Sequence, residues 1–465
     1  MDKFRFLTLL RPMDFSAAQK KLQPLGQEHL LRYWRELQPT QQKHLLKQIE
    51  GINADIFSAQ RRLVAQKGQP ARVEDVTPLD HWDQSGNLSD VAAGRSQIAK
   101  GKVGCLVVAG GQGTRLGFAG PKGLFPVTVV RHKTLYRLLA EKVRAASIQN
   151  DCWLPFVVMT SPENGDLTKQ YFEDNRNFGL KSAQIHFFVQ GTLPFVGDAG
   201  ELFLKDKADL AVGPDGNGCA LHHFYHSGLW HEWRAAGVEV VSFIQVDNPL
   251  ADPFDAELIG YHMRHGKDVT IKGTMRRDAD EKVGVVVKNN DRIAVVEYTE
   301  MPKSEKIALG VDGELKYPVA NMSNYCFSMS FIEKLCAAPL IDFPLHLAHK
   351  PVKVIGNDGR AHEIKAWKCE RFIFDVLAYA DDVAVIVYPR YVSYAPLKNA
   401  SGPDSLQSVQ NALLEYDRFV FQDVSGTAVL MEKPFELSPQ FYYPTAELLE
   451  RWKGAKLPED SYVKE

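Results

Sequence analysis

A glycine-rich stretch that ends in a lysine carries the residue types that bind phosphate. Gly110, Gly111 and Gly113 have no Cβ atom, so their backbone amides can turn toward phosphate oxygens and approach them closely. Arg115 can form two parallel hydrogen bonds to such oxygens, and Lys122 supplies a compact positive charge. Together these residues could hold a triphosphate.

Two common phosphate-binding motifs do not fit this stretch. The dinucleotide fingerprint GxGxxG, counted from Gly111, needs a glycine where this chain has Leu116. The P-loop needs Ser or Thr directly after its Gly-Lys pair, where this chain has Gly123. The sequence therefore argues against a redox enzyme with a dinucleotide cofactor. An ordinary glycine turn without a ligand is the remaining alternative, although few such turns follow a buried strand and carry both Arg and Lys.

Short apolar runs alternate with helical patterns around this stretch, and they predict the scaffold that must position it. The runs that indicate buried strands are residues 103–108, 155–159, 185–189 and 238–246, and the helical patterns include 135–146 and 221–236. This alternation predicts an α/β domain with a mostly parallel sheet. In such sheets ligands gather at the carboxyl ends of strands, where the glycine-rich stretch also lies.

The chain on either side of this α/β region has a different pattern. Residues 15–70 carry apolar residues at helical spacing, and residues 70–95 are rich in the residue types of connections. After residue 266 the expected strands lie closer together, as in an antiparallel insertion or a lobe of mixed sheet. These strands are 269–275, 283–287 and 293–298. Further on, residues 403–416 look helical and 419–431 look extended. The predicted divisions are a helical N-terminal region at 1–95, the α/β domain at 96–388 and a small α+β domain at 389–465.

Charge and cysteine usage restrict the function. The chain has 55 basic and 57 acidic residues, which argues against a dedicated nucleic-acid binder but allows a small anionic substrate. Its six cysteines show no CxxC spacing, so neither a disulfide framework nor a zinc site is indicated, and a reducing cytoplasm fits. Residues 1–10 do not look like a signal peptide, and no apolar run approaches a membrane span. We expect a soluble, cytoplasmic protein.

The pattern AGGQGTRLG, followed shortly by PKG, resembles the eukaryotic-type UDP-sugar pyrophosphorylases, which are UTP:sugar-1-phosphate uridylyltransferases. Within that family the likeness is to the UDP-N-acetylhexosamine (UDP-N-acetylglucosamine) pyrophosphorylases. Ten further segments agree in order: GQEHLLRYW at 26–34, MTS at 159–161, FFVQGTLP at 187–194, PDGNG at 214–218, QVDNPL at 245–250, VGVV at 283–286, EYTE at 297–300, NMSN at 321–324, FIFD at 372–375 and APLKNA at 395–400. Ten ordered matches over residues 20–400 are far more specific than any single motif.

The resemblance implies both an architecture and a reaction. The architecture is a Rossmann-like nucleotidyltransferase domain between a helical N-terminal region and a small C-terminal domain. The reaction joins UTP and N-acetylglucosamine 1-phosphate, or the galactosamine analogue, into the UDP-sugar and pyrophosphate, with Mg²⁺ as cofactor. The expected partners are the small-molecule substrates UTP, sugar 1-phosphate and UDP-sugar, without nucleic acid or membrane. The protein would be a monomer or a weak homo-oligomer.

Four residues are candidates for the chemistry. Arg115 and Lys122 would hold the leaving pyrophosphate, and the resemblance implies that Lys398 reaches the phosphates near the reacting centre. Asp247 ends an apolar strand, where a carboxylate can hold magnesium against phosphate oxygens. The alternative role for Asp247 is an N-cap, and the alternative for Lys398 is an ordinary surface lysine.

The resemblance further implies a uracil site and a sugar site. Backbone groups and a glutamine amide can match the carbonyls and N–H of uracil without charge, and carboxylate and amide groups suit sugar hydroxyls. The uracil site would contain Ala109, Gly110, Gly111, Gln190, Gly216, Asn217 and Gly218. The sugar site would contain Gly284, Glu297, Asn321, Asn324, Phe372 and Phe374. PDGNG also reads as a plain turn, and the two phenylalanines also read as core packing.

Four residues lie outside these assignments. Cys219 stands where the family pattern would have a second glycine, and it adds a side chain beside the expected nucleotide site. His222, His223 and His226 form a cluster on a predicted helix, but no carboxylate or cysteine pattern completes a metal site. We interpret the histidines as a solvated or packed helix surface.

Two other functions remain open at this stage. A UDP-glucose or broad-specificity UDP-sugar pyrophosphorylase would share the nucleotide half of the site, and a few pocket contacts decide the sugar. A non-catalytic sensor of nucleotide sugars could retain the same fold. Against the sensor, Arg115, Lys122 and Asp247 are all present.

Overall fold

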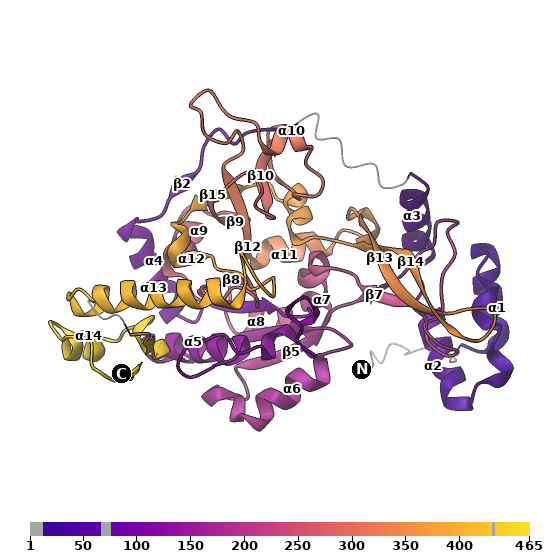
Figure 1. Ribbon diagram of the computed structural model, residues 1–465, viewed down its shortest axis with the longest axis horizontal. Coiled ribbons are helices and arrows are strands. Elements are labelled where there is room, and N and C mark those ends of the chain that lie inside the picture. The colour runs from indigo at the N-terminus through magenta and orange to yellow at the C-terminus, as the bar shows by residue number, and fades with distance from the viewer. Residues whose placement is uncertain (1–12, 67–75, 430–432) are drawn as a thin grey trace, which may run out of the picture. The chain divides into compact units, whose positions relative to one another are not determined.

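An 11-stranded mixed sheet is the main feature of the computed structural model, which describes residues 13–66, 76–429 and 433–465 (Figure 1). Its main path runs β2–β15–β9–β12–β8–β3–β4–β5. In that order the strands are Asp83–Gln84, Val383–Val387, Val269–Met275, Val319–Ser328, Val240–Gln245, Val103–Val108, Phe156–Thr160 and Ile185–Val189. Strand β12 is antiparallel to both of its neighbours on this path, and the other pairs are parallel. The predicted α/β fold with a mixed, mostly parallel sheet is confirmed.

An antiparallel branch leaves the sheet at β12. Strand β10 (Gly284–Asn289) pairs with β12, with β11 (Arg292–Val296) and with β1 (Val76–Thr77), antiparallel in each case. The strands predicted at 283–287 and 293–298 are therefore present as an antiparallel ribbon, as their close spacing suggested.

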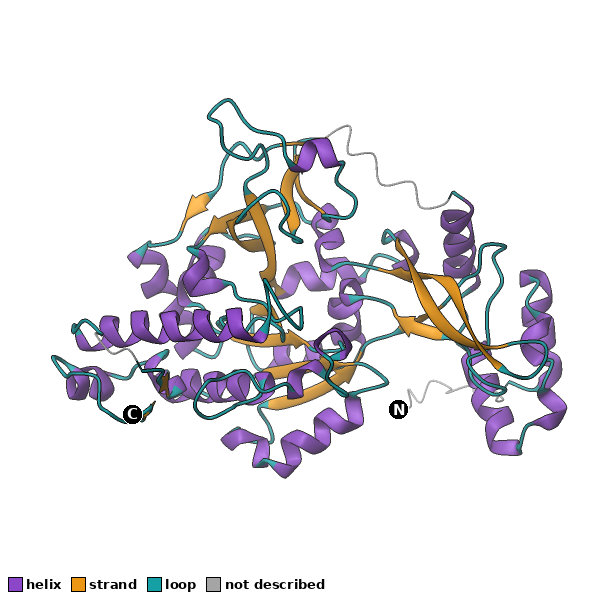
Figure 2. Cartoon of the chain, viewed as in Figure 1, coloured by secondary structure: helices purple, strands orange, loops and turns teal. Residues whose placement is uncertain are grey.

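Helices cover both faces of the sheet (Figure 2). On one face, the apolar side of α5 (Leu135–Gln149) packs into the same core as Cys105 of β3. On the other face, Trp233 of α8 (Leu229–Ala235) packs against Gly104, where a Cβ atom would lie 2.3 Å from the indole ring. Strand β3 is consequently buried along its whole length, as expected for an unbroken apolar strand in a parallel region.

The remaining helices of this part of the chain are short. They are α4 (Leu88–Ala99), α6 (Gly165–Asp174), α7 (Ala220–His226), α9 (Ala256–Arg264), α10 (Lys303–Lys306), α11 (Met329–Cys336) and α12 (Arg390–Ser393). The single helix predicted at 221–236 is in fact two helices, α7 and α8. Gly228 separates them because its φ of 89° lies in the left-handed region, which interrupts a right-handed helix.

The chain contacts divide the protein into two units. Of the described residues, 13–66, 192–215 and 340–371 form the smaller unit, and the larger unit contains the sheet. In the smaller unit three helices share a core with residues of two later segments, including Leu202 and Ile355. Its elements are α1 (Phe15–Leu22), α2 (Pro39–Glu50), α3 (Ala54–Ala65), β6 (Thr192–Pro194), β7 (Val212–Pro214), β13 (His346–Ile355) and β14 (Ala361–Glu370). The three-domain division expected from the sequence is a different partition and stays a prediction.

One prediction for the C-terminal segment is wrong. Residues 419–425, predicted to be extended, are the last two turns of α13 (Leu406–Ser425), and residues 430–432 lie outside the described residues. Val420, Phe421 and Val424 recur at helical spacing and share a small core with Phe435. The other elements of this segment are α14 (Ala446–Trp452), β16 (Glu436–Leu437) and β17 (Tyr462–Val463).

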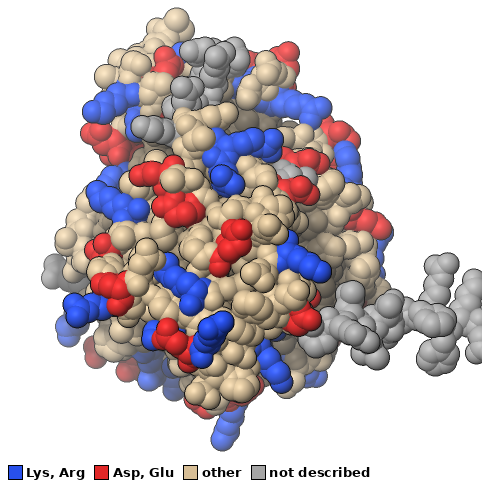
Figure 3. Space-filling model, turned by 90° about the vertical axis from the view of Figure 1, so that its right-hand side faces the viewer, with Lys and Arg blue, Asp and Glu red and all other residues tan. Residues whose placement is uncertain are grey.

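The surface and the helices show two general properties. On the face drawn in Figure 3, basic and acidic side chains are interspersed among uncharged ones, in keeping with their nearly equal numbers. Within the described part of the chain, no helix combines the length and apolar character that crossing a membrane requires.

A histidine on α9, His262, is buried among polar partners in the larger unit. Ser328 donates its hydroxyl hydrogen to a backbone carbonyl, so it accepts from His262 Nε2 at 3.0 Å, and Thr270 Oγ1 lies 2.9 Å from Nδ1. Burial, with a smaller contribution from the Lys267 ammonium, lowers the pKa of His262 from 6.5 to about 3. The imidazole is therefore neutral in the folded protein.

We expect the protein to lose stability as the pH falls below 6.5. Between about pH 6.5 and 3 the unfolded chain binds a proton on His262 that the folded chain does not. The free energy of unfolding should therefore fall by about 2 kcal/mol between pH 6.5 and pH 5 through this group. Urea unfolding at several pH values measures the slope, which His262→Gln should flatten. His265→Gln, an exposed neighbour, is the control. Equal slopes in the wild type and His262→Gln would contradict the prediction.

Candidate active site

The glycine-rich stretch folds back on itself directly after β3. The Lys122 amide donates to the Gly111 carbonyl at 3.0 Å, and the Gly113 amide donates to the Gly120 carbonyl at 2.9 Å. Within the described residues, the amides of Gly110 and Gly111 have no acceptor. The loop therefore holds a fixed shape and presents backbone donors to a bound anion.

Two buried side chains that the sequence did not single out support this loop. The Ala109 carbonyl accepts from Asn164 Nδ2 at 3.1 Å and from the Tyr136 hydroxyl at 3.4 Å. The Tyr136 ring also packs under Gly123, where a Cβ atom would lie 2.2 Å from ring carbons. Tyr136 thus holds the beginning of the loop through a hydrogen bond and its end through a ring contact. Gly123 is the only local sign of this arrangement in the sequence.

An ion pair joins the loop to the adjacent strand. Strands β3 and β8 are parallel neighbours, so their carboxyl ends meet at one edge of the sheet. Asp247 follows β8, and its Oδ2 lies 3.1 Å from Lys122 Nζ. Burial alone raises the pKa of Asp247, but the charges of Lys122 and Lys398 outweigh it and hold the pKa below its usual range. The carboxylate therefore stays ionised between two lysines.

The second lysine comes from a distant part of the sequence. The Leu397 amide donates to the Asp247 carbonyl at 2.8 Å, which brings the APLKNA segment to the end of β8. Lys398 Nζ donates to the Tyr394 hydroxyl at 3.1 Å. Burial alone lowers the pKa of Lys398, but Tyr394 and Asp247 raise it above its usual range. The structure thus brings Lys122, Asp247 and Lys398 together as one cluster of charges.

Arg115 forms no ion pair with the three side chains of this cluster. It belongs to a single 3-10 turn, η5 (Thr114–Leu116), on the exposed side of the glycine-rich loop. In the described part of the chain its guanidinium has no ion-pair partner. Arg115 is therefore a cation on the same loop as Lys122 that remains open to solvent.

Gln190, a residue of the predicted uracil site, follows β5 and lies against the loop. Gln190 is 6% exposed, and a Cβ atom on Gly110 would lie 2.4 Å from its amide nitrogen. This contact brings together two residues predicted from the sequence. It also explains why the chain has glycine at 110, since any side chain there would push the glutamine away.

The PDGNG loop connects to the FIFD segment. Gly216 has a φ of 93°, a left-handed value that favours glycine, and Asn217 Oδ1 accepts from the Ile373 amide at 3.0 Å. Asn217 to Cys219 form the 3-10 turn η8. The Cys219 side chain, the departure from the family pattern, is fully buried. Asn217 thus has a structural partner in addition to its predicted place in the nucleotide site.

Three residues of the predicted sugar site meet where β10 pairs with β12. Gly284 and Asn321 are register partners, and a Cβ atom on Gly284 would lie 3.5 Å from Glu297 Oε2 and 3.8 Å from Asn321 Nδ2. Asn321 Oδ1 accepts from the Tyr325 hydroxyl at 2.9 Å, which fixes the direction of the amide. The atom nearest to such a Cβ atom would be Val295 Cγ1 at 3.0 Å, so a side chain at 284 would crowd the strand pairing as well as the carboxylate and the amide.

Asn324 lies on the same strand beyond a bulge in the pairing of β12 with β9. Its side chain is 3% exposed, and within the described residues its Oδ1 has no hydrogen-bond donor. A buried amide oxygen without a donor is costly unless another molecule supplies one. Asn324 is therefore a candidate contact for a bound ligand.

The aromatic pair belongs to the 3-10 helix η10 (Ile373–Tyr379) and the residue before it. The rings of Phe372 and Phe374 are 5.1 Å apart between centroids, and Phe374 is buried. Helix η10 contacts both β11 and η8. The segment therefore lies between the loop of Asn217 and the ribbon that leads to Glu297.

The histidine cluster is part of the packing of α7. The rings of His222 and His226 stack with centroids 5.2 Å apart, and His222 is buried. His223 Nε2 accepts a hydrogen bond from the Gly191 amide at 3.0 Å. This hydrogen bond holds the residue next to Gln190, a positioning role that the sequence did not indicate.

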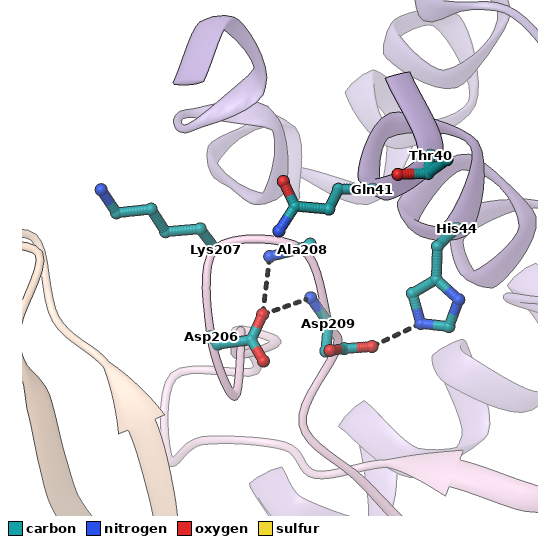
Figure 4. A pocket seen from close by; sticks show the side chains of 7 residues that line it. All are labelled: Thr40, Gln41, His44, Asp206, Lys207, Ala208 and Asp209. Atoms are coloured by element: carbon teal, nitrogen blue, oxygen red, sulfur yellow. Dashed lines mark hydrogen bonds and ion pairs between the residues drawn. The ribbon is translucent and has the colours of Figure 1, made fainter. Parts of the chain in front are cut away.

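A hollow of about 520 Å³ on the smaller unit does not resemble an active site (Figure 4). It lies between the first turns of α2 and the loop of residues 206–209. Asp206 accepts from the amides of Ala208 and Asp209, and Asp209 pairs with His44. The two carboxylates of the loop thus have partners within the loop or on the helix beside it, as the dashed lines in Figure 4 show.

The fold and the glycine-rich loop beside a Lys–Asp–Lys cluster define a nucleotidyltransferase. The chain belongs to the UTP–glucose-1-phosphate uridylyltransferase family, whose model matches residues 55–439. It is 31% identical over 447 residues to UDP-N-acetylhexosamine pyrophosphorylase-like protein 1 of Xenopus tropicalis, and the aligned region covers 89% of this chain and 86% of that protein. It is 30% identical over 456 residues to the UDP-N-acetylglucosamine pyrophosphorylase of Saccharomyces cerevisiae, with 92% and 95% covered.

A solved structure supports the fold. The UDP-N-acetylglucosamine pyrophosphorylase of Trypanosoma brucei, solved with an inhibitor, matches with a TM-score of 0.81 over 97% of each chain. The sequence identity is 23%, so this match concerns the fold alone. The family resemblance expected from the ordered motifs is confirmed by these comparisons.

Proposed function

We propose that this protein transfers the uridylyl group of UTP to a hexosamine 1-phosphate. The products are UDP-N-acetylglucosamine or UDP-N-acetylgalactosamine and pyrophosphate. The observation that carries this proposal is the cluster of Lys122, Asp247 and Lys398 beside free backbone amides at the carboxyl ends of β3 and β8. Few ligands other than a polyphosphate would match two lysines, one carboxylate and several amide donors.

The reaction needs no nucleophilic side chain. An oxygen of the sugar phosphate attacks the α-phosphorus of UTP in line, the bond to the β-phosphate breaks, and pyrophosphate leaves with the electron pair. Catalysis then depends on alignment and on neutralising the charge that builds up on the phosphate oxygens. Lys122 and Arg115 would hold the leaving pyrophosphate, and Lys398 would contact the phosphate at the reacting centre.

Asp247 fits the requirements of a magnesium ligand. Mg²⁺ commonly binds through one or two carboxylates together with substrate phosphates and water, and Asp247 offers an ionised carboxylate at the phosphate loop. When bound, the ion would neutralise phosphate charge and align the oxygens. Until substrate arrives, Lys122 balances the negative charge of Asp247.

The same geometry supports a uracil site and a sugar site. The Gln190 amide and the backbone of Gly110 offer donors and acceptors that suit the edge of a pyrimidine. Glu297, Asn321 and Asn324 offer polar groups to the sugar, and Asn324 Oδ1 is a buried acceptor that a substrate N–H or O–H would satisfy. The names of the two curated relatives above support a hexosamine.

A second candidate is a UDP-glucose or broad-specificity UDP-sugar pyrophosphorylase. The description of the matching family model, which names glucose 1-phosphate, favours it. The two candidates differ only in the sugar, where one polar contact can change the preference by orders of magnitude. The cytoplasmic location and the monomeric or weakly oligomeric state stay predictions from the sequence.

Turnover of four sugar 1-phosphates with UTP and Mg²⁺ tests the proposal. We expect kcat/KM for N-acetylglucosamine or N-acetylgalactosamine 1-phosphate to exceed that for glucose and galactose 1-phosphate by about 100-fold or more, because a contact to the acetamido group has no partner in the plain hexoses. Release of pyrophosphate gives the rates, and ATP in place of UTP is the control. Equal or faster turnover of glucose 1-phosphate would select the second candidate, and no turnover of any sugar would favour the non-catalytic sensor.

A further inference from the structure

We propose that Asn248 and Tyr394 are positioning residues that dock the segment of residues 393–398 against the end of β8 and so deliver Lys398 to the reacting phosphates. This inference rests on the proposed function, because it assigns a purpose to the position of Lys398. The docking itself is a structural property that can be measured without any turnover.

The Asn248 amide clamps two backbone groups of the segment. Asn248 is 1% exposed, its Nδ2 donates to the Ser393 carbonyl at 2.8 Å, and its Oδ1 accepts from the Ala395 amide at 3.0 Å. Asparagine offers both an N–H donor and a carbonyl acceptor on a short side chain, as these two bonds require. Aspartate would keep the acceptor and lose the donor, and alanine would lose both.

The neighbouring residue adds a third bond. The Leu397 amide donates to the Asp247 carbonyl at 2.8 Å. Residues 247 and 248 therefore hold the segment at every second residue, namely 393, 395 and 397. Lys398 follows immediately in a connection rather than in a helix or strand. A side chain on a loop is placed less precisely than one on a regular element unless such bonds fix the backbone. The dipeptide that supplies the carboxylate thus also determines where the lysine stands.

Tyr394 orients the ammonium and connects it to the sugar site. Its hydroxyl accepts from Lys398 Nζ at 3.1 Å, and its ring is 7% exposed. The ring shares a small core with Val283, Ala320 and Met322, which flank Gly284 and Asn321. Burial raises the pKa of Tyr394, so the phenol stays neutral and can act as an acceptor for the lysine. The packing therefore connects Lys398 to the strands of the proposed sugar site.

A double-mutant cycle with Lys398 tests the positioning role. We expect Asn248→Ala to lower kcat about 10- to 100-fold with a smaller change in KM for UTP, since a displacement of about 1 Å costs this much. In the Lys398→Ala background the same substitution should change kcat less than twofold, because the residue to be positioned is gone. Tyr394→Phe keeps the ring packing and should lower kcat by a smaller factor of about 5. Asn150→Ala, which removes two Nδ2 hydrogen bonds, one to the Ala146 carbonyl at 2.8 Å and one to Gln149 Oε1 at 3.4 Å, is the control.

Hydrogen exchange provides a readout that does not depend on the reaction. In Asn248→Ala the amides of Ala395 and Leu397 should exchange at least tenfold faster than in the wild type, with unchanged exchange in β3. Unchanged exchange at these amides would overturn the docking, and equal losses of kcat in both backgrounds would overturn the positioning of Lys398. If the wild type transfers no uridylyl group while exchange responds as expected, the proposed function fails and the docking stands.

Discussion

Removal of either partner of the Lys122–Asp247 pair is expected to lower kcat by about 10²- to 10³-fold, the usual loss when one group that stabilises transition-state charge is removed. Lys122→Ala deletes a cation that we propose holds the leaving pyrophosphate. Asp247→Asn deletes the proposed metal ligand and should also raise the magnesium concentration needed for half-maximal rate. Steady-state release of pyrophosphate, with UTP, sugar phosphate and Mg²⁺ each varied, measures both effects.

The pH dependence of the Lys122→Ala rate provides a second, independent test. Lys122 helps to hold the pKa of Asp247 down against the effect of burial, so its removal should move the acid limb of the rate profile to higher pH. Lys100→Ala and Asp423→Asn, which change exposed residues, serve as matched controls and should stay within twofold of the wild type. A Lys122→Ala enzyme with normal kcat would remove Lys122 from the mechanism. An Asp247→Asn enzyme with an unchanged magnesium requirement would remove the metal role.

A methyl group at the crossing of α4 and α9 is expected to destabilise the fold strongly. The two helices touch through glycines: a Cβ atom on Gly260 would lie 1.8 Å from the Asp90 carbonyl oxygen, and one on Gly94 would lie 1.8 Å from the Ala256 carbonyl oxygen. Backbone cannot rotate away as a side chain can, so the helices must separate. We expect Gly260→Ala to reduce the free energy of unfolding by about 3 kcal/mol, the upper end for overpacking. Urea unfolding followed by circular dichroism measures it.

The same substitution at a glycine with a much milder contact gives the comparison. Gly51 ends α2 with a right-handed φ of −71°, and the nearest atom to a Cβ there is a carbonyl oxygen at 3.3 Å. Gly51→Ala should change the free energy of unfolding by less than about 1 kcal/mol. Similar stability of Gly260→Ala and Gly51→Ala would show that the crossing tolerates a methyl group.

Local patterns sufficed for the glycine-rich loop and for several strands of the sheet, although not for all strands that carry site residues. The strands 103–108, 185–189 and 269–275 are β3, β5 and β9 with the same bounds. The α13 error has a physical cause: the apolar residues around Val420 suit an extended strand as well as one face of a helix. A short apolar run does not distinguish the two until its packing partners are known.

The partners of the site residues could not be predicted from local patterns. Asn164 and Tyr136 support the glycine loop through contacts that exist only after α5 and α6 pack on the sheet. Asn321 and Asn324 sit in β12, a strand that the sequence did not indicate, because polar residues interrupt its apolar alternation at the bulge. The roles proposed for the site residues come from the family resemblance and stay predictions, whereas their grouping is a property of the fold.

The make-up of the smaller unit has a consequence for synthesis on the ribosome. Arg32 Nη2 donates to the Ile355 carbonyl at 2.7 Å, and the Tyr33 hydroxyl donates to the Gly356 carbonyl at 2.5 Å, so the first helices share their core with a hairpin made some 300 residues later. Short helices are marginal without packing partners. The first helices therefore keep apolar surface exposed through most of translation. Chaperones that hold unfolded chains should bind this surface until the hairpin has emerged from the ribosome.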